Sequence, residues 1–420
     1  MLSIRKQLLK ANIMELESLK NKFEIKELEL NSLLEITQAI NDNLPEDSLY
    51  KIYNFTLRAN LNIKKLALYV LDEEWNCKVN FGTKNKFHNI ALDPFFFQFK
   101  TTTSLANLEN GAFSEFDRVV PVSHKDKTLA FVFIGGINEV GETTNGINIT
   151  MIQALSNIIL VAIENKKLAR KQLRQEAFRK ELEIARNVQH FLFPKNLPKT
   201  DTLNMESFYL PHHTIGGDYY DYIKIDDDRF LICIADVSGK GMPAAIIMSN
   251  FQASLNTLIR KTTDLEEIIE ELNFQIIKNA NGEHFITFFV AIYDYNTRKM
   301  EYVNAGHNPP VLIENDKIHS LEKGSTILGS FYPIPFLEKG SIEELSDFFY
   351  FSYTDGLTET FNVSNEPFGM DRLQDFLKQS YQSDLKELLQ SLLDQINLFK
   401  GPKNYDDDIT ILTCRVHNHR

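Results

Sequence analysis

Two runs in which apolar and aromatic residues alternate with others, Tyr220–Ile225 and Phe230–Ala235, lie near the middle of the chain. Alternation with a period of two is typical of half-buried β-strands, and the aspartates between the runs, Asp226–Asp228, are typical turn residues. The pattern therefore predicts one antiparallel β-hairpin. If its turn is centred on these aspartates, Asp218 and Asp236 lie opposite each other at the open end. Two facing carboxylates repel each other unless a proton or a cation lies between them.

The same reasoning predicts an α+β domain from residue 196 to residue 420, with antiparallel strands and helices on the outside. A second hairpin is expected over residues 286–305, with its turn at Tyr295–Thr297. A buried strand is expected at Phe348–Tyr353 and a last strand at Ile409–Val416. Four helices are expected in this region, at Pro243–Ile259, Leu265–Lys278, Asp371–Ser380 and Asp384–Phe399.

In the N-terminal half, the pattern of apolar residues predicts a helix over residues 1–30 and a separate α+β domain over residues 31–165. In this domain a helical stretch at Leu33–Ala59 precedes the strands, and a long helix begins near Ile149. Strands are expected at Lys65–Leu71, Trp75–Phe81, Arg118–Val122 and Leu129–Ile134. Helix, antiparallel strands and a closing helix resemble the layout of GAF and PAS sensor domains, and the order and length are more similar to GAF. This resemblance implies a sensor domain.

Residues 160–195 predict one continuous linker helix, because they contain good helix formers and no glycine or proline before Pro194. Apolar residues recur as an imperfect heptad, at Leu168, Leu173, Ala177, Leu182, Ala185, Val188 and Leu192. Such a stripe favours a coiled coil between two copies of the chain, and hence a homodimer. Packing of a single helix on its own C-terminal domain is the alternative.

Composition excludes several classes of protein. The 420-residue chain carries a net charge of -12, which argues against nucleic-acid binding. The three cysteines, Cys77, Cys233 and Cys414, are too far apart for a zinc site or a disulfide framework. A reducing, cytoplasmic compartment is therefore expected. No apolar run reaches the roughly 18 residues of a membrane span, so no transmembrane helix is expected.

Four aspartates fall at predicted strand ends. Asp218 and Asp236 close the first hairpin, Asp355 follows a buried strand, and Asp407 precedes the last strand. Strands that run in opposite directions bring such ends together, and four acids share one site only if cations neutralise them. Because no histidine or cysteine accompanies them, a hard cation such as Mg²⁺ or Mn²⁺ is expected. Metal pairs held by carboxylates carry out phosphoryl chemistry.

Five ordered motifs resemble the SpoIIE/RsbU-type serine phosphatases, the bacterial branch of the PPM-type metal-dependent phosphatases. They are GGDYYD, ADVSGKGMPAA, FITFFVAIYDYNTRKMEYVNAGHNPP, SYTDGLTE and DDDIT. The resemblance covers roughly residues 196–418. It implies a β-sandwich flanked by helices, with two Mn²⁺ or Mg²⁺ ions in a cleft at one edge.

The resemblance also implies the metal ligands. Asp218 matches the family's first acidic ligand, and Asp236 matches the bridging one. The carbonyl of Val237 matches a backbone ligand. Asp355 matches the acid of the DG motif, and Asp407 matches the first acid of the final motif.

Asp221 and Asp408 would lie just outside the ligands and hold them in place. Three consecutive aspartates leave the choice between Asp406, Asp407 and Asp408 open, and the pairing with Thr410 favours Asp407. No side chain would act as a covalent catalyst. The resemblance implies that a metal-bound water attacks a phosphoserine or phosphothreonine directly.

These features point to a serine/threonine phosphatase that is regulated by its N-terminal domain. The family usually acts on phosphorylated STAS-domain anti-sigma-factor antagonists, which implies a regulatory protein as partner. One alternative is a catalytically weak signalling scaffold with a phosphatase fold. A second is a nucleotide cyclase of the diguanylate type, whose GGD loop is similar to Gly216-Gly217-Asp218. Those cyclases place the loop at a hairpin turn, whereas here it precedes a strand.

Overall fold

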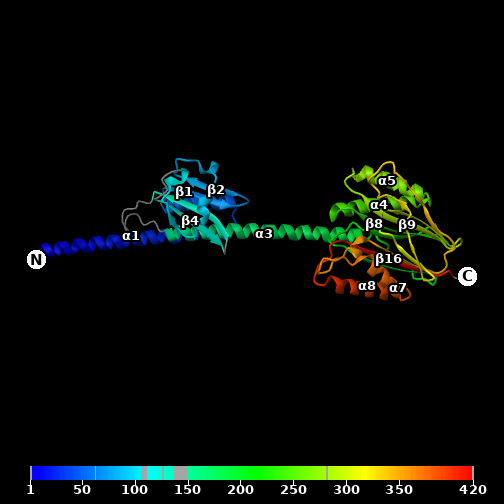
Figure 1. The fold of residues 1–420 in the computed structure, drawn as a ribbon. Helices are drawn as coiled ribbons and strands as arrows, with labels where there is room; N and C mark the ends of the chain where they lie inside the picture. Colours follow the sequence, from blue (N-terminus) through cyan, green and yellow to red (C-terminus); the bar gives the residue numbers. More distant parts are fainter. Residues whose placement is uncertain are drawn as a thin grey trace. The chain divides into compact units, whose positions relative to one another are not determined.

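The computed structural model describes residues 2–61, 63–105, 111–124, 127–136, 149–280 and 282–418. The chain divides into two compact units, Met1–Gln175 and Glu176–Arg420 (Figure 1). The division falls within the long helix α3 (Ile149–His190). This helix begins at the predicted residue, Ile149. It contains residues 160–190 of the predicted linker, which extends to residue 195.

The N-terminal unit is built on a five-stranded antiparallel sheet of order β2-β1-β5-β4-β3. Its strands are β1 (Lys65–Leu71), β2 (Trp75–Phe81), β3 (Thr103–Ser104), β4 (Arg118–His124) and β5 (Lys127–Gly135). One face packs on the helices α1 (Leu2–Asn41), α2 (Glu46–Phe55) and the start of α3 through an aliphatic core. The other face carries an aromatic core that includes Tyr69, Phe96 and Phe113 and is covered by short 3₁₀ segments at Phe87–Asn89, Pro94–Gln98 and Ala112–Glu115.

The helical stretch predicted for Leu33–Ala59 is interrupted. Helix α1 ends at Asn41, and α2 begins at Glu46 after Pro45. Asn43 has a φ of 56°, in the left-handed region that stops a helix. Pro45 has no amide hydrogen and therefore suits only the start of the next helix. A π-helical turn at Thr56–Asn60 then completes the segment.

The C-terminal unit is a sandwich of two mainly antiparallel sheets between two helical layers (Figure 1). The first sheet has the order β13-β10-β9-β8-β7, with β14 also on β10. The second has the order β12-β11-β15-β16-β6. The strands are β6 (Leu203–Leu210), β7 (Tyr219–Lys224), β8 (Arg229–Val237), β9 (Ile286–Asp294), β10 (Lys299–Ala305), β11 (Val311–Glu314), β12 (Lys317–Ser320), β13 (Gly324–Ser325), β14 (Gly340–Ile342), β15 (Phe348–Tyr353) and β16 (Ile409–Val416).

Helices α4 (Met242–Leu258) and α5 (Leu265–Ala280) cover the outer face of the first sheet, and α7 (Gly369–Ser380) and α8 (Leu385–Lys400) cover that of the second (Figure 1). One turn of helix, α6 (Asp355–Thr358), follows β15 directly. Apolar residues of both sheets and of α4 and α5 form the largest core. The predicted hairpins, buried strand and outer helices of this unit are all confirmed.

The linker helix carries exposed apolar side chains. Leu168, Leu173 and Val188 are 50%, 66% and 58% exposed, as the imperfect heptad requires if a partner covers it. The coiled coil and the homodimer stay predictions. Over the part of the chain that the structure describes, no helix is long and apolar enough to cross a membrane.

Candidate metal centre

The first hairpin places two acids opposite each other. Its ladder runs from Lys224 paired with Phe230 to Tyr219 paired with Ala235. One step further, the same register sets Asp218 opposite Asp236, as the alternating pattern predicts. The site therefore begins at the open end of β7 and β8.

Asp218 is held by two threonines from distant parts of the chain. The residue is 1% exposed, and its carboxylate accepts hydrogen bonds from the hydroxyls of Thr354 at 2.8 Å and Thr410 at 2.5 Å. Thr354 follows β15, and Thr410 lies in β16. Burial and the nearby charges of Asp236 and Asp408 raise the pKa of Asp218 well above its ordinary value, although the two threonines act against this. The second sheet thus completes the site that the first sheet begins.

The other acids lie near one another, and burial together with their charges raises their pKa values. Burial, followed by the charge of Asp355, raises the pKa of Asp236 to about 7, and Asp407 and Asp408 add to the rise. Burial, Glu359 and Asp407 raise the pKa of Asp355 in turn. The structure therefore brings together the acids that the sequence places at four strand ends.

Asp407 and Asp408 have different surroundings. Asp407 is 42% exposed at its side chain and forms an ion pair with Lys240 at 2.8 Å. Asp408 is more enclosed and accepts hydrogen bonds from the backbone amides of His212 at 2.7 Å and Gly217 at 2.8 Å. Asp408 thereby fixes the loop Gly216-Gly217-Asp218 (the GGD loop), while the side chain of Asp407 is more exposed to solvent. Asp406 contributes its carbonyl oxygen, which accepts a hydrogen bond from Lys240 at 2.5 Å.

Glycines permit the close approach of these segments. A Cβ at Gly217 would lie 2.9 Å from the carbonyl oxygen of Val237, the predicted backbone ligand. A Cβ at Gly216 would lie 2.3 Å from a carboxylate oxygen of Asp408, and one at Gly356 would lie 2.0 Å from its carbonyl oxygen. Side chains at these positions would force the strand ends apart.

Asp221 lies on the side of β7 that faces helix α4. Its carboxylate accepts hydrogen bonds from the hydroxyl of Tyr219 at 2.5 Å and from the amide of Asn256, on α4, at 3.5 Å. These contacts tie α4 to the strand that follows the GGD loop. The role of Asp221 in supporting the ligands stays a prediction.

The donor set fits a hard divalent cation, although the predicted ligands do not surround one point as a complete metal site would. Across the described ranges, no three His, Cys, Asp or Glu side chains are arranged so that they could hold a metal ion. Instead, threonines, backbone amides and Lys240 satisfy the carboxylates one by one. Several buried acids with raised pKa values around one lysine form an environment that a cation would stabilise, and oxygen donors favour Mg²⁺ or Mn²⁺.

Two residues that contact the acids of the site are not predicted from the sequence. Thr354 holds Asp218, and its signal is the hydroxyl directly before the Asp-Gly pair at a strand end. Lys240 neutralises Asp407, and its signal is the single cation within ADVSGKG. Both contacts depend on long-range pairing, which local patterns do not specify.

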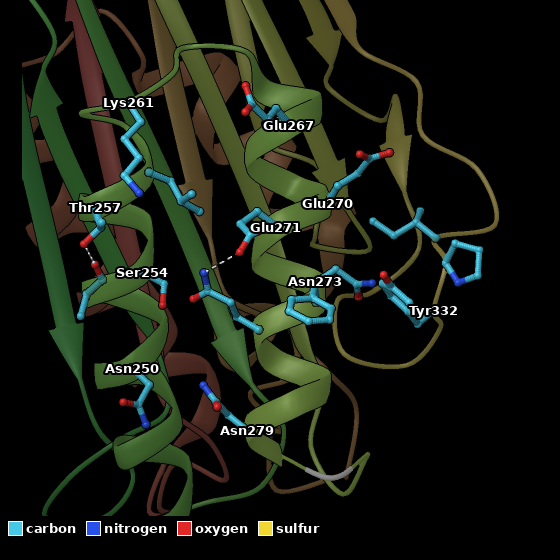
Figure 2. A pocket seen from close by; sticks show the side chains of 16 residues that line it. Asn250, Ser254, Thr257, Lys261, Glu267, Glu270, Glu271, Asn273, Asn279 and Tyr332 are labelled. Atoms are coloured by element: carbon cyan, nitrogen blue, oxygen red, sulfur yellow. Dashed lines mark hydrogen bonds between the residues drawn. The ribbon is translucent and has the colours of Figure 1, made fainter.

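A groove of about 990 Å³ lies elsewhere, between α4, α5 and the loop that carries Tyr332. Figure 2 shows its acidic side, with Glu267, Glu270 and Glu271 on α5. The acids of the candidate metal centre do not line it. This groove is therefore separate from the proposed chemistry.

Comparison with known proteins relates the C-terminal unit to a family. Residues 226–417 match the family model described as Stage II sporulation protein E (SpoIIE). This stretch, somewhat less than half of the chain, is similar to the SpoIIE family. The matched residues contain Asp236, Asp355 and Asp407, while Asp218 lies just before them. The match agrees with the resemblance to SpoIIE/RsbU-type phosphatases that the motifs indicate.

Three similar proteins support the assignment. Phosphoserine phosphatase RsbU of Bacillus subtilis is 28% identical over 57% of this chain and 71% of its own length. Protein IcfG of Synechocystis sp. is 25% identical over 70% of this chain, which spans only 51% of IcfG. The solved SiaA-PP2C domain of Pseudomonas aeruginosa has a TM-score of 0.52 at 19% identity, covering 58% of this chain and 98% of that domain. The last comparison shows the PP2C fold that the SpoIIE domain shares.

Proposed function

We propose that this chain is a metal-dependent serine/threonine phosphatase. The observation that carries the proposal is the convergence of Asp218, Asp236, Asp355 and Asp407 at one end of a SpoIIE-like sandwich. In this proposal these aspartates and the carbonyl of Val237 hold two Mn²⁺ or Mg²⁺ ions. Such ions polarise the phosphoryl group and lower the pKa of a water molecule that they coordinate.

The protein's own residues supply position and charge. Thr354 and Thr410 fix the carboxylate of Asp218, and Asp408 fixes the GGD loop through the amide of Gly217. Lys240, whose side chain is 43% exposed, adds a positive charge beside Asp407 where an anionic phosphoryl group would arrive. In the wild type the glycines keep the segments close enough for these contacts.

The proposed substrate is a phosphorylated regulatory protein. RsbU is named a phosphoserine phosphatase, and its similarity to this chain supports phosphoserine as the group hydrolysed. A STAS-domain anti-sigma-factor antagonist is the specific partner we propose, from the resemblance to the RsbU type. The free thiols Cys77, Cys233 and Cys414 agree with a cytoplasmic location.

Hydrolysis of a phosphoserine protein tests the proposal directly. The full chain is expected to release inorganic phosphate from a phosphorylated STAS-domain protein when Mn²⁺ is present. Excess EDTA should reduce the rate by at least about 100-fold, because the acids alone cannot activate water. Phosphate release that is insensitive to EDTA would contradict the metal mechanism. No release from any phosphoserine protein would favour the scaffold, and consumption of GTP would favour the cyclase.

We also propose that the GAF-like sensor domain, residues 31–165, regulates the phosphatase through helix α3 and a homodimer. The exposed apolar stripe on α3 supports pairing of two copies. Deletion of residues 1–165 is expected to change the phosphatase rate several-fold, because the sensor would no longer bias helix pairing. Rates for both forms on the same phosphoprotein measure this. Unchanged rates would show that the N-terminal domain does not control the enzyme.

A further inference from the structure

Gln189 joins the end of helix α3 to the GGD loop. The residue is 6% exposed, and its Nε2 donates a hydrogen bond to the carbonyl oxygen of Gly216 at 2.8 Å. Its Oε1 accepts the amide of the same glycine at 3.4 Å. One side-chain amide thus satisfies both polar groups of one buried backbone position.

The opposite side of the loop is held equally closely. The amide of Gly217 donates to Asp408, and Gly216 has no room for a Cβ because Asp408 and the hydroxyl of Tyr209 lie against it. The loop is therefore confined between Gln189 on one side and Asp408 on the other. Asp218 follows the loop directly, so its position depends on both contacts.

The end of α3 is itself anchored within the C-terminal unit. Phe193, just after the helix, is 7% exposed, and its ring lies 4.8 Å from that of Tyr209 and 5.1 Å from that of Tyr220. The backbone amide of Leu192 donates to the carbonyl of Gln189 at 2.9 Å and closes the last turn. These contacts hold the Gln189 side chain in place at the start of the domain.

We propose that Gln189 is a positioning residue that holds the Gly216-Gly217-Asp218 loop and thereby sets the metal affinity of the site. This inference rests on the proposed function, because it assigns Asp218 to a metal. Groups that orient metal ligands without touching the metal commonly change its affinity by ~10- to 100-fold when they are lost.

Two variants of the full chain test this role. Gln189→Leu keeps the approximate size and removes both hydrogen-bonding groups. Gln189→Glu keeps the size and one acceptor but removes the donor to Gly216. Asn187→Leu is the matched control, because Asn187 is an exposed amide on the same turn of the helix. Thermal melting of the metal-free proteins checks that each variant folds.

The first measurement is hydrogen–deuterium exchange of the metal-free chain over residues 211–221. Both Gln189 variants are expected to exchange about tenfold faster there than the wild type and the control, because a hydrogen-bonded clamp is lost. A merely structural residue would instead change exchange throughout the unit or not at all. Exchange in this segment that matches the wild type would overturn the inference.

The second measurement is calorimetric titration of the same proteins with MnCl₂. The Gln189 variants are expected to bind Mn²⁺ ~10- to 100-fold more weakly, with Asn187→Leu unchanged. Faster exchange with unaltered Mn²⁺ affinity would overturn the link between the loop and the metal. A wild type that takes up no Mn²⁺ would overturn the proposed function and that link together, while the exchange data still decide whether Gln189 holds the loop.

Discussion

The Asp236→Asn variant is expected to lose at least about a thousandfold in kcat toward a phosphoserine protein, because the site would lose one of the carboxylates proposed to hold the metal ions. Its metal-free form is expected to be more stable than the wild type near neutral pH. Burial, followed by the charge of Asp355, raises the pKa of Asp236 to about 7. An amide of the same shape carries no charge, so it removes both the cost of burying a carboxylate and the repulsion from its neighbours. One substitution should therefore abolish activity and stabilise the fold.

The stability difference should depend on pH with a definite sign. In the unfolded chain the carboxyl of Asp236 ionises near 3.8, whereas in the folded chain its pKa is about 7. Below about pH 4 the group is neutral in both states and contributes nothing. As the pH rises toward 7, the unfolded state releases its proton first, so the wild type loses stability. Above about pH 7 the penalty is constant, on the order of 4 kcal/mol.

Urea unfolding in EDTA across this pH range, together with phosphatase assays in Mn²⁺, measures both effects. Asp227→Asn is the control, because Asp227 lies in the exposed hairpin turn with a side chain that is 93% accessible. The control should keep its activity and follow the wild-type pH dependence. A fully active Asp236→Asn protein would refute the site assignment. A stability gain that is the same at pH 4 and at pH 8 would refute the electrostatic explanation.

The Gly356→Ala variant is expected to lose about 3 kcal/mol or more in free energy of unfolding, together with most of its activity. A Cβ at this position would lie 2.0 Å from the carbonyl oxygen of Asp408 and 3.2 Å from the Cβ of Asp407. The nearest atom belongs to the backbone, so rotation of a side chain cannot relieve the overlap. The segment that carries both aspartates must move, and the acids then separate.

Gly282→Ala separates this steric effect from backbone strain. Gly282 has a φ of +76° with no neighbour within 4 Å of an added Cβ, so its substitution introduces strain alone. A cost of about 1–2 kcal/mol with full activity is expected there. Urea midpoints and kcat of the two variants provide the comparison. If Gly356→Ala is as stable and as active as Gly282→Ala, the close packing of Gly356 against Asp408 is not needed for stability or activity.

The hairpin could be predicted because its information is local. A period of two defines the strands, and a run of aspartates defines the turn, so the register that opposes Asp218 and Asp236 follows from counting. The break between α1 and α2 also had a local signal in Asn43 and Pro45, which the helical composition around it obscured.

The division of roles at the final motif could not be predicted in this way. Asp407 and Asp408 are neighbours of the same type, and only the fold decides which of them meets the amides of His212 and Gly217. The contact of Lys240 with Asp407 likewise joins segments that are far apart in the chain. Such contacts depend on the pairing of whole sheets rather than on any window of sequence.

The two threonines on Asp218 have a consequence for synthesis of the protein. Thr410 reaches Asp218 across 192 residues of chain, and its strand β16 lies inside the second sheet, between β15 and β6. A nascent chain whose β16 segment is still inside the ribosome lacks an interior strand of this sheet. It also lacks Asp407 and the hydroxyl of Thr410 that donates to Asp218. Dephosphorylation by this protein should therefore begin only when translation of the domain is complete, with no activity from partly made chains.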